Sequence, residues 1–242
     1  MRSDQSDLRS VFVIGTDTGV GKSLVSAALL RGAAQAGLRA VGMKPVAAGI
    51  DPQPDGSLAC GDVLTLQAAG NVAADPALVN PFCLPDPLSP HLAARRAGQR
   101  ITLAPLVAAH RALLAQADRV IVEGAGGFLV PLDEGDGDGD GDPVPGAPLL
   151  TGADLALALG VPLVLVVGLR LGCLNHALLT AEAVRARGLT LAGWVANRID
   201  PAMACADENL DFLRRHIPAP LLADVPHASR WPEGWQPSLF LS

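Results

Sequence analysis

Half of the 242 residues are apolar and 17% are charged, with a formal net charge of −6 at pH 7. This composition argues against an intrinsically disordered chain and against a broad nucleic-acid-binding surface. Aromatic residues make up only 3% of the chain, too few for a platform that stacks single-stranded bases. The longest apolar run, Val161–Val167, is far shorter than the roughly 20 residues of a membrane span.

Residues 1–10 are polar and are predicted to form a flexible N-terminus, without the apolar segment of a secretory signal. The four cysteines are scattered along the chain with no C-x-x-C pair, which predicts reduced thiols. We therefore expect a cytoplasmic protein that binds neither membranes nor nucleic acid.

The predicted elements alternate between strand and helix. A β-branched and aromatic run predicts a buried strand at Val11–Ile14, and apolar residues at helical spacing predict a helix from Lys22 to about Ala36. Further strands are predicted at residues 40–45, 120–123, 163–168, 191–197 and 221–224, and further helices at residues 62–69, 91–97, 103–116, 151–159, 175–187 and 206–216. Residues 46–61 and 71–90 are predicted to be loops, and the glycine-rich residues 124–127 a turn.

The predicted strands are continuously apolar, as in a parallel sheet that is buried on both faces. We therefore expect a single α/β domain over residues 1–242, with a mostly parallel sheet and helices on both faces. The segment Glu134–Pro143 repeats Asp and Gly, which cannot build a core, so it is predicted to be a flexible surface insert. A calcium loop is excluded because the glutamate that would complete it is missing at its place.

The segment Gly15–Ser23, GTDTGVGKS, connects the first strand and the first helix, which is the context of a phosphate-binding loop. Backbone N–H groups of such a loop converge on phosphate oxygens, and Gly19 and Gly21 allow the close approach. Lys22 would reach the β- and γ-phosphates, and the Ser23 hydroxyl would bind Mg²⁺. The first glycine stands one residue earlier than in the usual G-x4-G-K-[ST] pattern. The prediction is a P-loop NTPase fold that binds ATP with Mg²⁺.

Two acids and a second lysine complete the predicted site. Glu123 directly follows a buried strand, so its carboxylate is expected in the ligand-binding crevice at the end of the sheet. Asp62 would either bind Mg²⁺ or cap a helix, two roles that look the same in the sequence. Lys44 ends another strand and would either face the phosphates or extend to solvent.

These residues belong to a set of segments that together resemble the dethiobiotin synthetase family over nearly the whole chain. The segments are GTDTGVGKS (15–23), MKPVAAG (43–49), VEGAGGFLVPL (122–132), VVGLRLGCLNHALLT (166–180), GWVANR (193–198) and IPAPLLADVP (217–226). The resemblance implies ATP- and Mg²⁺-dependent carboxylation of 7,8-diaminononanoate with CO₂. A carbamate forms on one amine, ATP phosphorylates it to a carbamic–phosphoric mixed anhydride, and the second amine closes the ureido ring, releasing ADP and phosphate.

The resemblance also implies roles for individual residues. Lys44 and Lys22 would be catalytic, and Ser23, Asp62 and Glu123 would hold Mg²⁺. The implied ATP-binding residues are Gly19, Val20, Gly21, Lys22, Ser23, Leu24, Asp62, Glu123, Gly124, Ala125, Gly126, Asn197, Arg198, Pro226, His227, Ala228 and Glu233, with Asn197 at the adenine base. The implied substrate-binding residues are Thr16, Lys44, Ala48, Ser89, Leu171, Gly172 and Asn175.

The family further implies a homodimer with a shared active site, in which the segment Leu171–Asn175 binds the substrate carboxylate across the interface. Three positions depart from the family pattern: Ser23 replaces a common Thr, Gly19 a frequent acid, and Ala48 a frequent hydroxyl residue. Ala48 has no hydroxyl with which to make the contact to substrate that the family pattern implies.

Two other functions fit a phosphate-binding loop. Amide-forming enzymes of corrin biosynthesis usually carry an additional glutaminase domain, for which 242 residues leave no room. Switch ATPases of the MinD/ParA type carry a lysine early in the loop, and they often carry a basic amphipathic tail as well. This chain has Thr16 and Asp17 in that early part of the loop.

Overall fold

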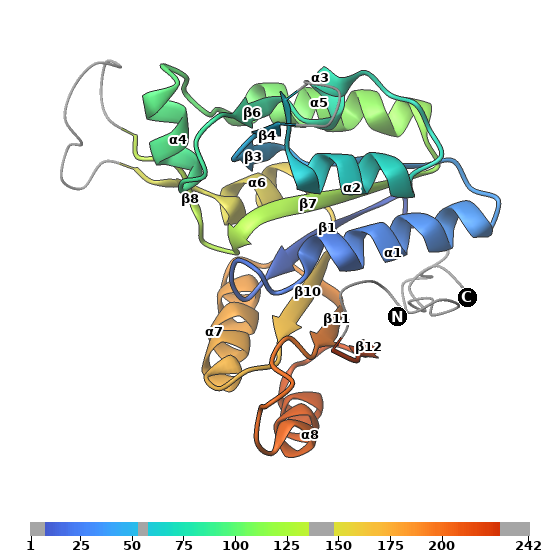
Figure 1. The fold of residues 1–242 in the computed structure, drawn as a ribbon, viewed down its shortest axis with the longest axis vertical. Coiled ribbons are helices and arrows are strands. Elements are labelled where there is room, and N and C mark those ends of the chain that lie inside the picture. Colours follow the sequence, from blue (N-terminus) through green and yellow to red (C-terminus); the bar gives the residue numbers. More distant parts are fainter. Residues whose placement is uncertain (1–7, 53–57, 136–147, 228–242) are drawn as a thin grey trace.

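The computed structural model describes residues 8–52, 58–135 and 148–227, and its centre is a six-stranded parallel sheet in the order β12-β11-β10-β1-β7-β2 (Figure 1). The strands are β1 (Ser10–Gly15), β2 (Ala40–Met43), β7 (Arg119–Gly127), β10 (Leu163–Gly168), β11 (Leu191–Asn197) and β12 (Leu221–Val225). The predicted fold class is therefore confirmed.

Helices cover both faces of this sheet. They are α1 (Lys22–Gln35), α2 (Gly61–Ala69), α3 (Pro76–Val79), α4 (Pro90–Arg96), α5 (Leu103–Gln116), α6 (Gly152–Leu159), α7 (Cys173–Ala186) and α8 (Ala206–His216). Alternate residues of β1 face opposite sides, so Val11 and Val13 pack with α1 and α2, while Phe12 and Ile14 share the core that includes α3 to α8. Within the described ranges, no helix combines the length and apolar content needed to cross a bilayer.

Three short strand pairs lie outside the main sheet. They are β3 (Val46–Ala48) with β6 (Phe82–Leu84), β4 (Asp51–Pro52) with β5 (Leu58–Ala59), and β8 (Pro131–Asp133) with β9 (Leu150–Thr151). The prediction of continuous loops at 46–61 and 71–90 is therefore wrong. Both stretches are proline-rich, yet β3 and β6 pair across more than thirty intervening residues, a contact that no local sequence pattern records.

The predicted turn at 124–127 is also wrong, because β7 continues through these residues and Gly127 pairs with Gly15. The glycines permit this close approach, since a Cβ on Gly124 would lie 3.1 Å from the Phe12 ring. At the N-terminus, β1 already includes the buried Ser10, so the chain is ordered before the predicted limit of the flexible segment. Most of the predicted insert, like residues 1–7, lies outside the described residues.

The order of the strands fixes where the site lies. After β1 the chain enters α1 on one face of the sheet, whereas after β7 it reaches α6 on the opposite face. Because β1 and β7 are neighbours, their outgoing connections separate and leave a crevice at the carboxyl edge of the sheet. The phosphate-binding loop and Glu123 both come from these two strands.

Candidate functional site

The loop between β1 and α1 has the geometry of a phosphate-binding loop. Gly19 and Gly21 have φ values of 73° and 94°, in the left-handed region that favours glycine. Gly21 is the N-cap residue of α1, and no side chain caps the first turn. The N–H groups of Lys22 and its neighbours at the start of α1 therefore remain suited to phosphate oxygens, which the helix dipole also favours.

Asn197, at the end of β11, holds this loop through its side-chain amide. Its Nδ2 donates a hydrogen bond to the carbonyl oxygen of Val20 at 2.9 Å, and the side chain is buried. A Cβ on Gly21 would lie only 2.2 Å from the same nitrogen, so the loop and the amide are in direct contact. The resemblance places Asn197 at the adenine base, and this loop contact was missed because its two partners are 177 positions apart in the sequence.

Lys22 is buried beneath the loop, where its Nζ donates to the carbonyl oxygen of Asp17 at 2.9 Å. Burial and the nearby positive charge of Lys44 lower the pKa of Lys22 to about 8. The carboxylate of Asp17 accepts the N–H of Thr18 and forms an ion pair with Arg170, which follows β10. The sequence analysis missed Arg170, whose partner is also distant in sequence.

Lys44 lies directly after β2 and is the centre of a compact cluster. Its Nζ lies 2.6 Å from Glu123 Oε1 and 2.7 Å from Asp62 Oδ2, with the carbonyl oxygen of Gly124 at 3.3 Å. The Ser23 hydroxyl is 2.7 Å from Asp62 Oδ1 and 2.9 Å from Glu123 Oε1. Four residues predicted separately from the sequence thus meet at one point.

At Lys44 and at Asp62, the structure excludes one of the two roles that the sequence left open. Lys44 does not extend to solvent, because only 5% of its side chain is exposed. Asp62 is not the cap of α2, because Cys60 occupies the N-cap position and Asp62 lies within the first turn. Lys44 is also held through its backbone, since its N–H donates to Val79 O and its carbonyl accepts from Asn80 Nδ2. Asn80 was not predicted as part of the site.

Opposite charges balance the cost of burying these groups. Burial disfavours the charged form of Lys44, but the carboxylates of Glu123 and Asp62 outweigh it and raise its pKa. Burial acts to raise the pKa of Asp62, but Lys44 and Ser23 outweigh burial and lower that pKa. At Glu123 burial outweighs the effect of Lys44, so the pKa of Glu123 is raised. Lys22 and Lys44 are the only lysines in the sequence, so every lysine of the chain lies in this site.

The oxygen atoms in the cluster fit Mg²⁺. Ser23, Asp62 and Glu123 offer a hydroxyl and carboxylates, and Glu123 Oε2 is buried without a hydrogen-bond partner. Within the described part of the chain, no three His, Cys, Asp or Glu side chains converge into a metal cage. Mg²⁺ ordinarily binds through one or two carboxylates together with substrate phosphates, so such a cage is not required.

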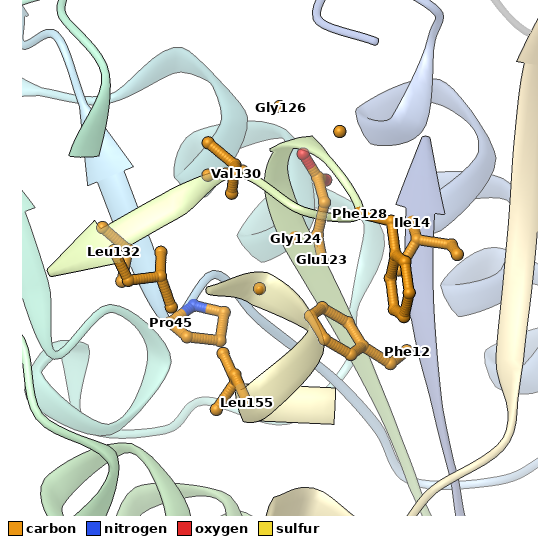
Figure 2. Close-up of a pocket in the computed structure, with 14 residues that line it drawn as sticks. Phe12, Ile14, Pro45, Glu123, Gly124, Gly126, Phe128, Val130, Leu132 and Leu155 are labelled. Atoms are coloured by element: carbon orange, nitrogen blue, oxygen red, sulfur yellow. The ribbon is translucent and has the colours of Figure 1, made fainter. Parts of the chain in front are cut away.

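An apolar pocket adjoins the cluster on the α6 side of β7. Phe12, Phe128 and Leu155 form part of its wall, together with the glycine-rich end of β7. Figure 2 shows the carboxylate of Glu123 directed away from the rings of Phe12 and Phe128. Glu123 thus lines this pocket and also belongs to the polar cluster, and only 1% of its side chain is exposed.

The remaining residues that were predicted to bind ATP, together with Thr16, lie partly in the elements that form this cluster and partly near the end of the chain. Thr16, Val20, Leu24, Gly124, Ala125 and Gly126 belong to the phosphate-binding loop, α1 or β7. Arg198 pairs with Asp224 and Asp207, and its carbonyl accepts a hydrogen bond from His227 Nδ1 beside Pro226. Ala228 and Glu233 lie outside the described residues.

The remaining residues predicted to bind substrate outside the phosphate-binding loop lie in other elements, apart from the cluster around Lys44. Ser89 is the N-cap residue of α4, and Ala48 ends β3. Leu171 is 94% exposed, and Gly172 is the N-cap of α7, so Asn175 lies inside the helix instead of capping it. Among the described residues, no hydrogen bond or ion pair connects Ser89, Ala48 or Asn175 with Lys44.

Comparison with known families agrees with this geometry. A family profile described as an AAA domain matches residues 9–231. The chain belongs to this family. The family consists of P-loop NTPases and includes dethiobiotin synthetase. The predicted nucleotide-binding fold is thereby confirmed, and binding of ATP with Mg²⁺ is the general property of such proteins.

Solved structures with a similar fold include ParA and MinD proteins. The ParA family ATPase from Chlorobium tepidum TLS is 13% identical with a TM-score of 0.55, and the match covers 92% of this chain and 86% of that one. MinD from Pyrococcus horikoshii OT3, in complex with Mg-ADP, is 14% identical with a TM-score of 0.52, covering 91% and 82%. The MinC:MinD complex from Aquifex aeolicus is 13% identical with a TM-score of 0.51, and the match covers 91% of this chain and 82% of that one. At these identities the likeness shows a shared fold.

Proposed function

We propose that this P-loop NTPase is a dethiobiotin synthetase, which uses ATP to carboxylate 7,8-diaminononanoate and close its ureido ring. The observation that carries the proposal is Lys44, a second buried lysine held beside Glu123, Asp62 and the phosphate-binding loop. A carbamate and a triphosphate are both anionic, so their reaction needs positive charge concentrated where they meet. Lys22, Lys44 and the N-terminus of α1 supply that charge on a protein whose net charge is negative.

Each side chain then has a definite task. Lys22 and the loop N–H groups would hold the β- and γ-phosphates, and Asn197 would keep the loop in shape through Val20. Ser23, Asp62 and Glu123 would hold Mg²⁺, which when bound neutralises phosphate charge. Lys44 Nζ would contact the carbamate oxygen and the γ-phosphate, so that the γ-phosphoryl group passes from ATP to the carbamate and ADP leaves.

Ring closure needs positioning more than further acid–base chemistry. The second amine attacks the carbonyl carbon of the mixed anhydride, a C–N bond forms, the amine nitrogen gives up a proton to water, and phosphate leaves with the electron pair of the broken C–O bond. We further propose a homodimer in which the exposed segment Leu171–Asn175 binds the substrate carboxylate across the interface. The uncapped first turn of α7 supports this role, since helix N-termini bind carboxylates well.

A switch ATPase of the ParA/MinD type is the second candidate. The solved structures reported above favour it, because they share the fold over most of the chain. The loop itself argues the other way, since Thr16 and Asp17 stand where such switches carry an early lysine. The buried Lys44 has no evident task in a switch that only binds and hydrolyses ATP.

The purified protein should be incubated with Mg²⁺, ¹³C-bicarbonate, diaminononanoate and either ATP, CTP or GTP. The proposal predicts phosphate release that depends on the diamine and a product that contains one ¹³C atom, detected by mass spectrometry. Phosphate release that ignores the diamine but rises with DNA or anionic lipid vesicles would instead establish the switch. Gel filtration with light scattering tests the proposed dimer independently.

A further inference from the structure

Lys44 contacts the same oxygen atoms that are expected to hold the divalent cation. Its ammonium is within 2.7 Å of both Asp62 Oδ2 and Glu123 Oε1. The Ser23 hydroxyl, the third expected ligand, donates to carboxylate oxygens of the same two residues. The ammonium of Lys44 therefore already supplies a positive charge among the three expected metal ligands.

The contacts are close enough to exclude a second cation. An ion bound between Asp62 and Glu123 would lie against the ammonium of Lys44. Lys44 and Glu123 are buried and Asp62 is half-exposed, so two positive charges at this point repel strongly. Lys44 and a divalent ion must therefore compete for these carboxylates. Lys22 differs, because its ammonium is bonded to the carbonyl oxygen of Asp17 and to neither carboxylate.

We propose that Lys44 acts as an internal counterion that keeps the divalent cation out until nucleotide arrives. Phosphate groups in the loop offer the ammonium new anionic partners, so binding of the metal–nucleotide complex turns Lys44 from the carboxylates toward the γ-phosphate. The same movement loads the metal and presents the lysine to the phosphoryl group. This inference rests on the proposed function only for the second of these steps, because the competition itself involves the protein and the cation alone.

The competition can be measured without nucleotide or substrate. Mn²⁺ replaces Mg²⁺ so that the free ion can be counted by electron paramagnetic resonance during a titration. We compare the unaltered protein with Lys44→Met and with the matched control Lys22→Met, which removes the other lysine of the same site. Lys44→Met should bind Mn²⁺ tighter by about tenfold or more, because the competing positive charge is removed, and Lys22→Met should gain much less. Equal gains in the two variants, or none, would overturn the proposal.

A second measurement leaves the protein unaltered and covers the case in which Lys44→Met fails to fold. Because the chain has only two lysines, ¹³C labelling at the lysine ε carbon gives just two signals, which the spectrum of Lys22→Met assigns. Mg²⁺ alone, at a concentration that displaces bound Mn²⁺, should shift the Lys44 signal and leave that of Lys22 nearly in place. An unmoved Lys44 signal under those conditions would show that lysine and metal do not compete. A failure of dethiobiotin synthesis would leave both of these results untouched.

Discussion

The contact between Asn197 and the phosphate-binding loop predicts that Asn197→Asp weakens both the fold and nucleotide binding. The substitution keeps the size of the side chain but replaces the NH₂ group that donates to Val20 O at 2.9 Å with an oxygen. The Val20 carbonyl then faces an acceptor in a buried position, and a negative charge lies beside the loop that must receive phosphates.

The size of the effect follows from the lost donor. A buried group left without its hydrogen bond costs about 1–3 kcal/mol, which in a chain of this length lowers the melting temperature by roughly 2–12 °C. ADP affinity should fall by about tenfold or more, since about 1.4 kcal/mol of lost binding energy is one factor of ten. Thermal unfolding and isothermal titration with ADP measure the two effects separately.

The chain offers a matched control in Asn209→Asp. Asn209 Nδ2 also donates to a backbone carbonyl, that of Cys205 at 2.7 Å, but the bond is exposed and lies at the start of α8. Water can replace the lost donor there, so stability should change little and ADP affinity not at all. If the two variants lose equal stability and affinity, the argument from Asn197 is refuted.

Three further predictions concern the site and the core. Lys44→Ala should lower turnover by about 100-fold or more while ATP still binds, because the charge opposite the γ-phosphate is lost; unchanged turnover contradicts this role. Glu123→Gln should raise the Mg²⁺ concentration for half-maximal activity by about tenfold or more, and an unaltered metal titration counts against it. Burial and then Arg111 lower the pKa of His110, whose ring donates to Ser10 Oγ. Because the unfolded chain takes up the proton first, the protein should lose unfolding free energy as the pH falls below about 6.5, by at most about 1.4 kcal/mol per pH unit. His110→Gln should show a smaller loss over the same range in urea titrations, and parallel curves would refute the assignment.

Sequence patterns confined to one short stretch were sufficient to predict much of the fold. The apolar run of β1, the loop with Gly19 and Gly21, and the helical spacing of α1 are consecutive in the chain, so each could be recognised by itself. The parallel sheet followed from strands that are apolar on both sides. Elements that depend on a distant partner, such as β3 with β6 and the glycine-rich end of β7, were not recognised.

The sequence alone singled out the residues that are predicted to carry the chemistry, because a lysine or a carboxylate in or after a buried strand is costly unless it serves a site. Only the tertiary structure decided how those residues meet. Lys44 reaches Glu123 across 79 positions, and Ser23 reaches Asp62 across 39, by way of strands that the sheet brings together. Hydrogen bonds act over a few ångströms in space whatever the separation along the chain, so the partners of Lys44, Asn197 and Asp17 emerged only once the strand order was known.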